Sequence, residues 1–142
     1  MTTRRLNPTE VLDRPVELPA FFAYLGLSLV AVAPEEVVIR MEVPPTLYSA
    51  FGNIHGGAVA TLIDTALGAV VACNVSEHDR IATHALNINY VSFSKERALL
   101  AKARVLRLNR TVATVECDCV TESGTLVAKA LGTFGVYRRS AT

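Results

Sequence analysis

The sequence lacks three features that would each point to a particular class of protein. Its formal net charge is only +1 over 142 residues, so bulk electrostatics does not indicate nucleic-acid binding. Its N-terminal segment, residues 1–14, is polar and lacks the apolar core of a secretory signal. Its three cysteines form no disulfide framework, which predicts reduced thiols and a cytoplasmic location.

The cysteines also offer little to a metal ion. Cys117 and Cys119 are spaced to point to the same face of a strand, as two metal ligands would. No third or fourth ligand lies near them in the sequence, so we expect two small core side chains and no metal.

The longest apolar stretch is Ala58–Cys73, which we expect to be too short to span a bilayer. It belongs to a helix predicted to open at His55-Gly56-Gly57 and to end near Asn74, with an apolar stripe at helical spacing. The other side carries small residues, and the helix contains no Lys, Arg or Glu. Such a helix must be covered all round, so we expect a sheet on one side and a second subunit or a loop on the other.

The remaining elements are predicted to be mostly strands joined by short links. We expect a short helix over Ala20–Leu25 and strands over Gly26–Ala33, Glu36–Val43, Ile81–Phe93, Ala98–Leu108, Thr111–Val120 and Thr125–Tyr137. Short links favour antiparallel pairing, so the last four strands should form a meander. The sequence therefore predicts one α+β domain over residues 20–142, a curved antiparallel sheet wrapped around one long helix, after an irregular lead-in over residues 1–19.

Asp64 is the one formal charge in the predicted helix. A carboxylate at the edge of an apolar stripe is costly unless it is hydrogen-bonded or faces a cleft. Two interpretations follow: a structural carboxylate bonded to a backbone amide or a neighbouring Thr, or a reactive group in a functional site.

Gly56 and Gly57 lie where this helix begins. Free backbone N–H groups collect at a helix N-terminus, and the helix dipole is positive there. Without Cβ atoms, the turn would let a carbonyl oxygen approach and would stabilise negative charge developing on it. A pair of glycines that merely permits a tight turn is the alternative.

A family resemblance connects these features. Asn53–Gly57 followed by Ala60–Asp64 closely resembles the helix signature of hotdog-fold thioesterases, and the likeness continues through Thr83 and Asn87–Tyr90. It covers about residues 25–138 and is nearest to the PaaI and acyl-CoA thioesterase 13-like group. The resemblance implies a hotdog fold and hydrolysis of acyl-CoA.

The resemblance also implies roles for individual residues. Gly56 would supply the N–H that polarises the thioester carbonyl, and His55 would shape that loop. Asp64 would act as a general base on water or as a nucleophile. Thr83 matches a Ser/Thr position that helps to hold the water, contributed across the dimer.

One position departs from the family pattern. The family often has Asn or Gln six residues before the His, and Ser49 stands there. Its hydroxyl can still donate but reaches less far, and Asn53 is a second residue for that role, or a loop-turn residue. The expected substrate-binding residues are Asn53, Gly57, Asn87, Arg107 and Arg110. The arginines are expected to bind CoA phosphates, or else to be ordinary surface charges.

The resemblance thus predicts an acyl-CoA thioesterase acting on aromatic or medium to long acyl groups. No metal or redox cofactor is expected, since coenzyme A arrives as part of the substrate. We expect a homodimer or homotetramer, with neither nucleic acid nor membrane as a partner. Two alternatives stay open, a hotdog hydratase or dehydratase and a non-catalytic acyl-CoA or acyl-carrier binding protein.

Overall fold

The computed structural model describes residues 20–140, and the lead-in expected over residues 1–19 lies outside them. The described chain contains helices α2 (Ala20–Tyr24) and α3 (Gly56–Asn74), a short 3-10 helix η1 (Pro45–Leu47), and strands β1 (Leu27–Val32), β2 (Val37–Glu42), β3 (Arg80–Tyr90), β4 (Ala98–Leu108), β5 (Val112–Thr121) and β6 (Leu126–Tyr137). Every predicted helix and strand is present, and η1 adds a short helical turn between β2 and α3 that was not predicted.

The strands form one antiparallel sheet in the order β1-β2-β4-β5-β6-β3. The predicted meander is wrong at its first strand, because β3 pairs with β6 at the sheet edge while β4 lies between β2 and β5. The link over residues 91–97 crosses the end of the sheet, where Val91 N–H donates to Val127 O at 2.8 Å. Crossing three strand spacings takes about 14 Å, and seven extended residues reach about 23 Å, so this link does not force adjacent pairing.

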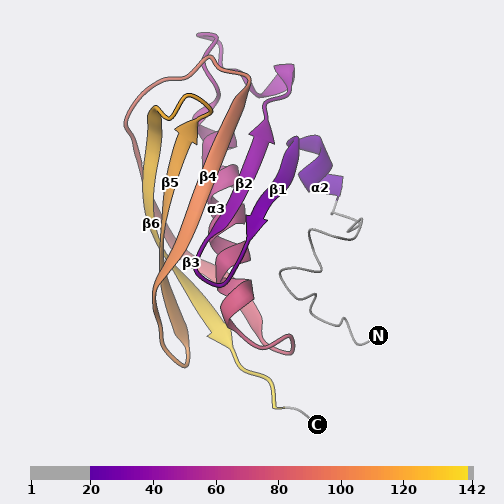
Figure 1. Ribbon diagram of the computed structural model, residues 1–142, viewed down its shortest axis with the longest axis vertical. Coiled ribbons are helices and arrows are strands. Elements are labelled where there is room, and N and C mark those ends of the chain that lie inside the picture. Colours follow the sequence, from indigo (N-terminus) through magenta and orange to yellow (C-terminus); the bar gives the residue numbers. More distant parts are fainter. Residues whose placement is uncertain (1–19, 141–142) are drawn as a thin grey trace.

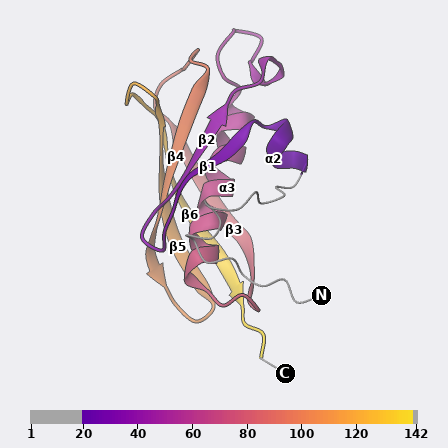
Figure 2. The same cartoon turned by 45° about the vertical axis from the view of Figure 1, so that its right-hand side comes forward.

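Helix α3 lies across one face of the sheet and contacts all six strands. Figures 1 and 2 show the curved sheet covering one side of the helix. The buried residues of α3 recur at helical spacing and are Ala58, Val59, Leu62, Ile63, Ala66, Leu67, Val70 and Val71. The predicted apolar stripe and the predicted sheet around one long helix are both confirmed.

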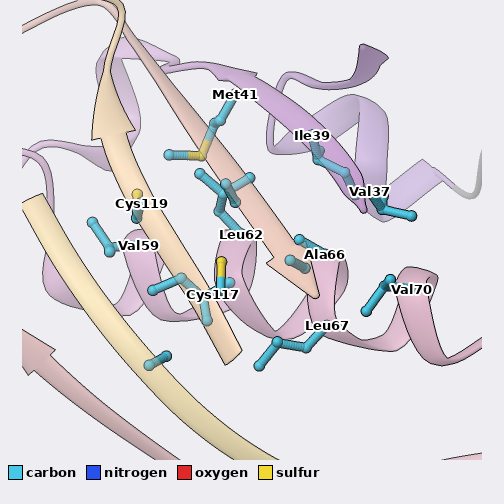
Figure 3. Close-up of a cluster of buried hydrophobic side chains, with 14 of the residues drawn as sticks. Val37, Ile39, Met41, Val59, Leu62, Ala66, Leu67, Val70, Cys117 and Cys119 are labelled. Atoms are coloured by element: carbon cyan, nitrogen blue, oxygen red, sulfur yellow. The ribbon is translucent and has the colours of Figure 1, made fainter. Parts of the chain in front are cut away.

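The core lies between α3 and the sheet. Figure 3 shows Leu62 and Leu67 projecting from α3 among sheet side chains that include Met41 of β2 and Cys117 of β5. Cys117 and Cys119 are fully buried in this cluster, which confirms them as core side chains. Burial raises the pKa of both thiols to about 12. Within residues 20–140, no group of three or more His, Cys, Asp or Glu side chains is placed to hold a metal ion.

The length of α3 corrects one expectation. The helix has 19 residues and is apolar enough to cross a bilayer by length and composition, so describing the stretch as too short was wrong. Length and composition are weak evidence for a span when one helix alone meets them, since the core helix of a folded domain meets them too. Here the sheet covers the apolar stripe, as expected for a core helix.

Two surfaces next to each other are only partly covered within one chain. No residue of the edge strand β3 is buried, whereas every second residue of β5 is. The small-residue side of α3, which includes Ala60, Asp64 and Gly68, is half-buried. Part of that side already packs within the chain, because the Phe134 ring of β6 approaches within 3.5 Å of where a Gly68 Cβ would lie.

Candidate active site

The turn that opens α3 is organised by His55. This residue is the N-cap, with extended backbone angles (φ −62°, ψ 135°), and its Nδ1 accepts a hydrogen bond from Gly57 N–H at 2.9 Å. A capping side chain satisfies one of the N–H groups that a helix start leaves without an intrahelical partner. Because Nδ1 is the acceptor, the neutral ring carries its proton on Nε2.

The neighbouring Gly56 N–H is left available. Within residues 20–140 no acceptor pairs with it, while the Gly56 carbonyl accepts a hydrogen bond from the Tyr90 hydroxyl at 2.8 Å. The dipole of α3 makes this end of the helix positive. A carbonyl oxygen placed here would meet a backbone donor where negative charge is favoured.

Asp64 lies two turns further along α3 and is half-buried. Its Oδ1 accepts a hydrogen bond from the Thr83 hydroxyl of β3 at 2.8 Å. The expectation that Thr83 reaches the site from across the dimer stays a prediction, while its contact with Asp64 forms within one chain. The physical reason is that β3, at the sheet edge, runs beside α3 and faces Thr83 toward the helix. The carboxylate is thereby held in one orientation without being sealed from solvent.

The two candidate groups, the Gly56 N–H and the Asp64 carboxylate, are too far apart to contact one carbonyl within a single chain. Eight residues at 1.5 Å rise place Asp64 about 12 Å along the helix from Gly56. Neither Asp64 nor Thr83 lines the cavity beside the glycine turn. One chain therefore carries both candidate groups but does not bring them together.

The cavity beside the glycine turn has a volume of about 280 Å³. Four residues predicted for the site line it, namely Ser49, Asn53, His55 and Gly56. Three aromatic residues that sequence reasoning did not assign to the site line it as well, namely Phe51, Tyr90 and Phe93. Phe51 is 86% exposed and Phe93 is 88% exposed, so the mouth of the cavity is strongly apolar. Apolar residues outside the predicted core are the sequence signal that could have identified Phe51 and Phe93, whereas Tyr90, at the end of β3, carries no such signal.

Ser49 and Asn53 belong to the tight loop that carries Phe51. Ser49 N–H donates to the Asn53 carbonyl, and the Ser49 hydroxyl accepts from Phe51 N–H at 3.3 Å. Gly52 has a φ of +78°, which a side chain would disfavour. Both predicted residues therefore shape the loop and line the cavity.

Gly57, which was also predicted for the site, does not line this cavity. It lines a second cavity of about 250 Å³ with Phe21, Leu25, Thr46, Leu47, Tyr48, His55, Ala58 and Thr61. His55 lines both cavities, which lie beside the turn that opens α3.

Three further predicted residues lie away from this turn. Asn87 pairs with exposed Leu131 on the face of the sheet opposite α3. Arg107 and Arg110 lie at the β4–β5 hairpin, which is at the end of the sheet opposite the start of α3 (Figure 1). The Arg107 side chain donates to Asn109 Oδ1 at 3.1 Å. A single chain does not bring these residues to the glycine turn.

Comparisons with known proteins identify the family and the fold of this chain. The model of the thioesterase superfamily matches residues 51–128. Acyl-coenzyme A thioesterase 13 of Mus musculus is 27% identical over 132 residues, covering 91% of this chain and 94% of that protein. The solved structure of a conserved protein of Pseudomonas aeruginosa is similar with a TM-score of 0.79 at 27% identity, covering 84% of this chain and 94% of that one. A thioesterase structure from Haemophilus influenzae has a TM-score of 0.82 at 20% identity, covering 97% and 96%.

The family match spans more than half of the chain and includes the glycine turn, Asp64 and Thr83. The antiparallel sheet on one long central helix is the architecture of the similar solved structures. The sequence match and the fold lead to the same conclusion: the chain belongs to the thioesterase superfamily and is a hotdog-fold hydrolase.

Proposed function

We propose that this hydrolase cleaves acyl-CoA thioesters to a free acid and coenzyme A. The observation that carries the proposal is that α3 presents an available Gly56 N–H at its start and the Thr83-oriented carboxylate of Asp64 two turns later. Coenzyme A as the leaving group is supported by similarity to a relative named acyl-coenzyme A thioesterase 13.

We propose further that a second copy of the chain completes the site. The two groups lie about 12 Å apart along one helix, which is too far for both to contact one carbonyl. Edge strand β3 has no buried residue and leaves a row of backbone groups open to pairing. Pairing of two β3 strands about a two-fold axis would run the two α3 helices antiparallel, bringing Gly56 of one chain toward Asp64 of the other.

In the proposed reaction Asp64 is the general base. Thr83 occupies Oδ1, which leaves Oδ2 to take a proton from water as its oxygen attacks the thioester carbonyl carbon. The carbonyl oxygen becomes an oxyanion and is stabilised by the Gly56 N–H at the positive helix end. The carbonyl then re-forms, the C–S bond breaks, and the departing thiolate takes up the proton held by Asp64.

The acyl group is proposed to be apolar, either aromatic or a medium to long chain. The cavity beside Gly56 and its exposed aromatic residues Phe51 and Phe93 support this class. A thiol-release screen across acyl-CoA esters of varied chain length and aromaticity tests it. Release of free thiol also separates hydrolysis from a hydratase reaction, in which coenzyme A stays attached.

Replacing Asp64 with Asn tests the central role. We expect kcat to fall by about 100-fold or more, because the amide cannot accept the water's proton, while binding of coenzyme A persists. Asp118→Asn is a matched control, since Asp118 pairs with Arg104 and Lys129 on the sheet and away from the cavity. Full turnover by Asp64→Asn would contradict the proposal, and a protein that only binds acyl-CoA would show no thiol release in any variant.

A further inference from the structure

One peptide unit of the turn that opens α3 is held at both ends by side chains. The Gly56 carbonyl accepts from the Tyr90 hydroxyl at 2.8 Å, and the N–H of the same peptide, that of Gly57, donates to His55 Nδ1 at 2.9 Å. Tyr90 is the last residue of β3, so the clamp ties the helix start to the sheet edge.

This peptide borders the one proposed to bind the thioester carbonyl. The Gly56 N–H belongs to the preceding peptide, and its direction depends on the backbone angles of Gly56. Glycine has more backbone freedom than any other residue, so two successive glycines need external restraint to hold one geometry. The capping His55 restrains only the N–H end of the Gly56–Gly57 peptide.

We propose that Tyr90 is a positioning residue for the hydrolysis, its hydroxyl locking the Gly56 carbonyl so that the Gly56 N–H points at the thioester oxygen. This role rests on the proposed function. Stabilisation of an oxyanion depends on donors fixed before the reaction, because reorientation during the reaction reduces the stabilisation.

The surroundings of Tyr90 suit a permanent donor. Its ring atoms lie 3.5 Å from where a Gly56 Cβ would stand, so the ring packs directly on the turn. Burial raises the pKa of the Tyr90 hydroxyl, which keeps its proton in place through the neutral and mildly alkaline range. The hydroxyl is occupied by the Gly56 carbonyl and acts through it.

The experiment compares wild type with Tyr90→Phe, which keeps the ring and removes the hydroxyl. We expect kcat to fall about tenfold with KM nearly unchanged, because substrate still binds but the oxyanion donor is less well held. The matched control is Tyr137→Phe, which loses a comparable hydroxyl contact, to His84 Nε2 at 3.0 Å, on the sheet face away from α3. The control should retain both kcat and KM.

Three results would overturn the inference, and they can be told apart. Unchanged kcat in Tyr90→Phe, or a rise in KM with kcat intact, would remove the positioning role while leaving the proposed function standing. Equal losses in Tyr90→Phe and Tyr137→Phe, with equal falls in melting temperature, would show general destabilisation instead. If wild type releases no thiol from any acyl-CoA, the proposed function itself fails, and the role of Tyr90 fails with it.

Discussion

Asp64 was the most informative residue in the sequence, because it is the one formal charge in the predicted helix. Its hydrogen-bond partner and its burial could be learned only from the structure. A lone carboxylate in an apolar helix allowed either a structural or a reactive role. The structure gives it one side-chain partner, Thr83, and leaves it half-buried. Among residues 20–140, no protein group donates to the second oxygen of Asp64, so this oxygen can be reached by water, as the proposed general base requires.

Thr83→Val tests whether this contact serves the reaction. Loss of a hydrogen bond to a charged group costs about 2 kcal/mol, so we expect kcat to fall roughly thirtyfold as the carboxylate loses its orientation. Thr83→Ser retains the hydroxyl and should stay near wild-type activity. Combining Thr83→Val with Asp64→Asn should add little to the loss from Asp64→Asn alone. Additive losses would mean that Thr83 acts elsewhere.

At the scale of elements, β5 shows how alternation in sequence becomes a buried face. Its residues alternate between half-buried and buried, and Cys117 and Cys119 occupy the buried positions against α3. This was predictable, because a strand with period-two patterning can orient only one set of side chains toward a core.

The burial of the two β5 thiols, Cys117 and Cys119, predicts how this strand responds to thiol reagents and to alkaline pH. In the folded protein at pH 8 they should resist a thiol reagent until denaturant is added, whereas half-buried Cys73 should react first. Burial raises their pKa from 9.0 to about 12, so the protonated form is favoured in the fold. Their contribution to stability should therefore be complete below pH 9 and decline as pH rises toward 12. Urea unfolding across that range should show a smaller alkaline loss in Cys117→Ala/Cys119→Ala, and an identical loss would contradict the assignment.

Strand β3 marks the limit of prediction for elements. Its existence was predicted from apolar and β-branched residues, but its position beside β6 was not. The local sequence pattern indicates which residues form a strand. Which strand β3 pairs with depends instead on the path of the link that follows β3. Residues 91–97 bond to β6, to the segment before α3 and to the residue after β2, and none of these contacts has a local sequence signal.

For the whole molecule, the prediction is that two chains share each site. If Asp64 acts with Gly56 of the partner, an Asp64→Asn chain and a Gly56→Val chain, each inactive alone, should form a mixed dimer with one intact site. Random pairing of equal amounts should restore about a quarter of wild-type activity. Activity that stays absent after unfolding and refolding the two chains together would contradict a shared site.

The oligomeric state in solution gives a separate test of the proposed assembly. Sedimentation at micromolar concentration should show a dimer or a larger assembly, since β3 and the small-residue side of α3 are incompletely covered in one chain. A stable monomer with full thioesterase activity would refute the proposed assembly and leave hydrolysis within one chain as the alternative.

The elements, the apolar face of α3 and the candidates Gly56 and Asp64 could be predicted from local features, because helix and strand periodicity, a glycine turn and a lone charge are each contained in a short stretch of chain. The fold was needed to show that β3 lies at the sheet edge, that Thr83 meets Asp64 within one chain, and that Tyr90 reaches the glycine turn. These contacts join residues far apart in sequence. Their existence depends on how the sheet curves over α3, and no short stretch of the chain encodes that curvature.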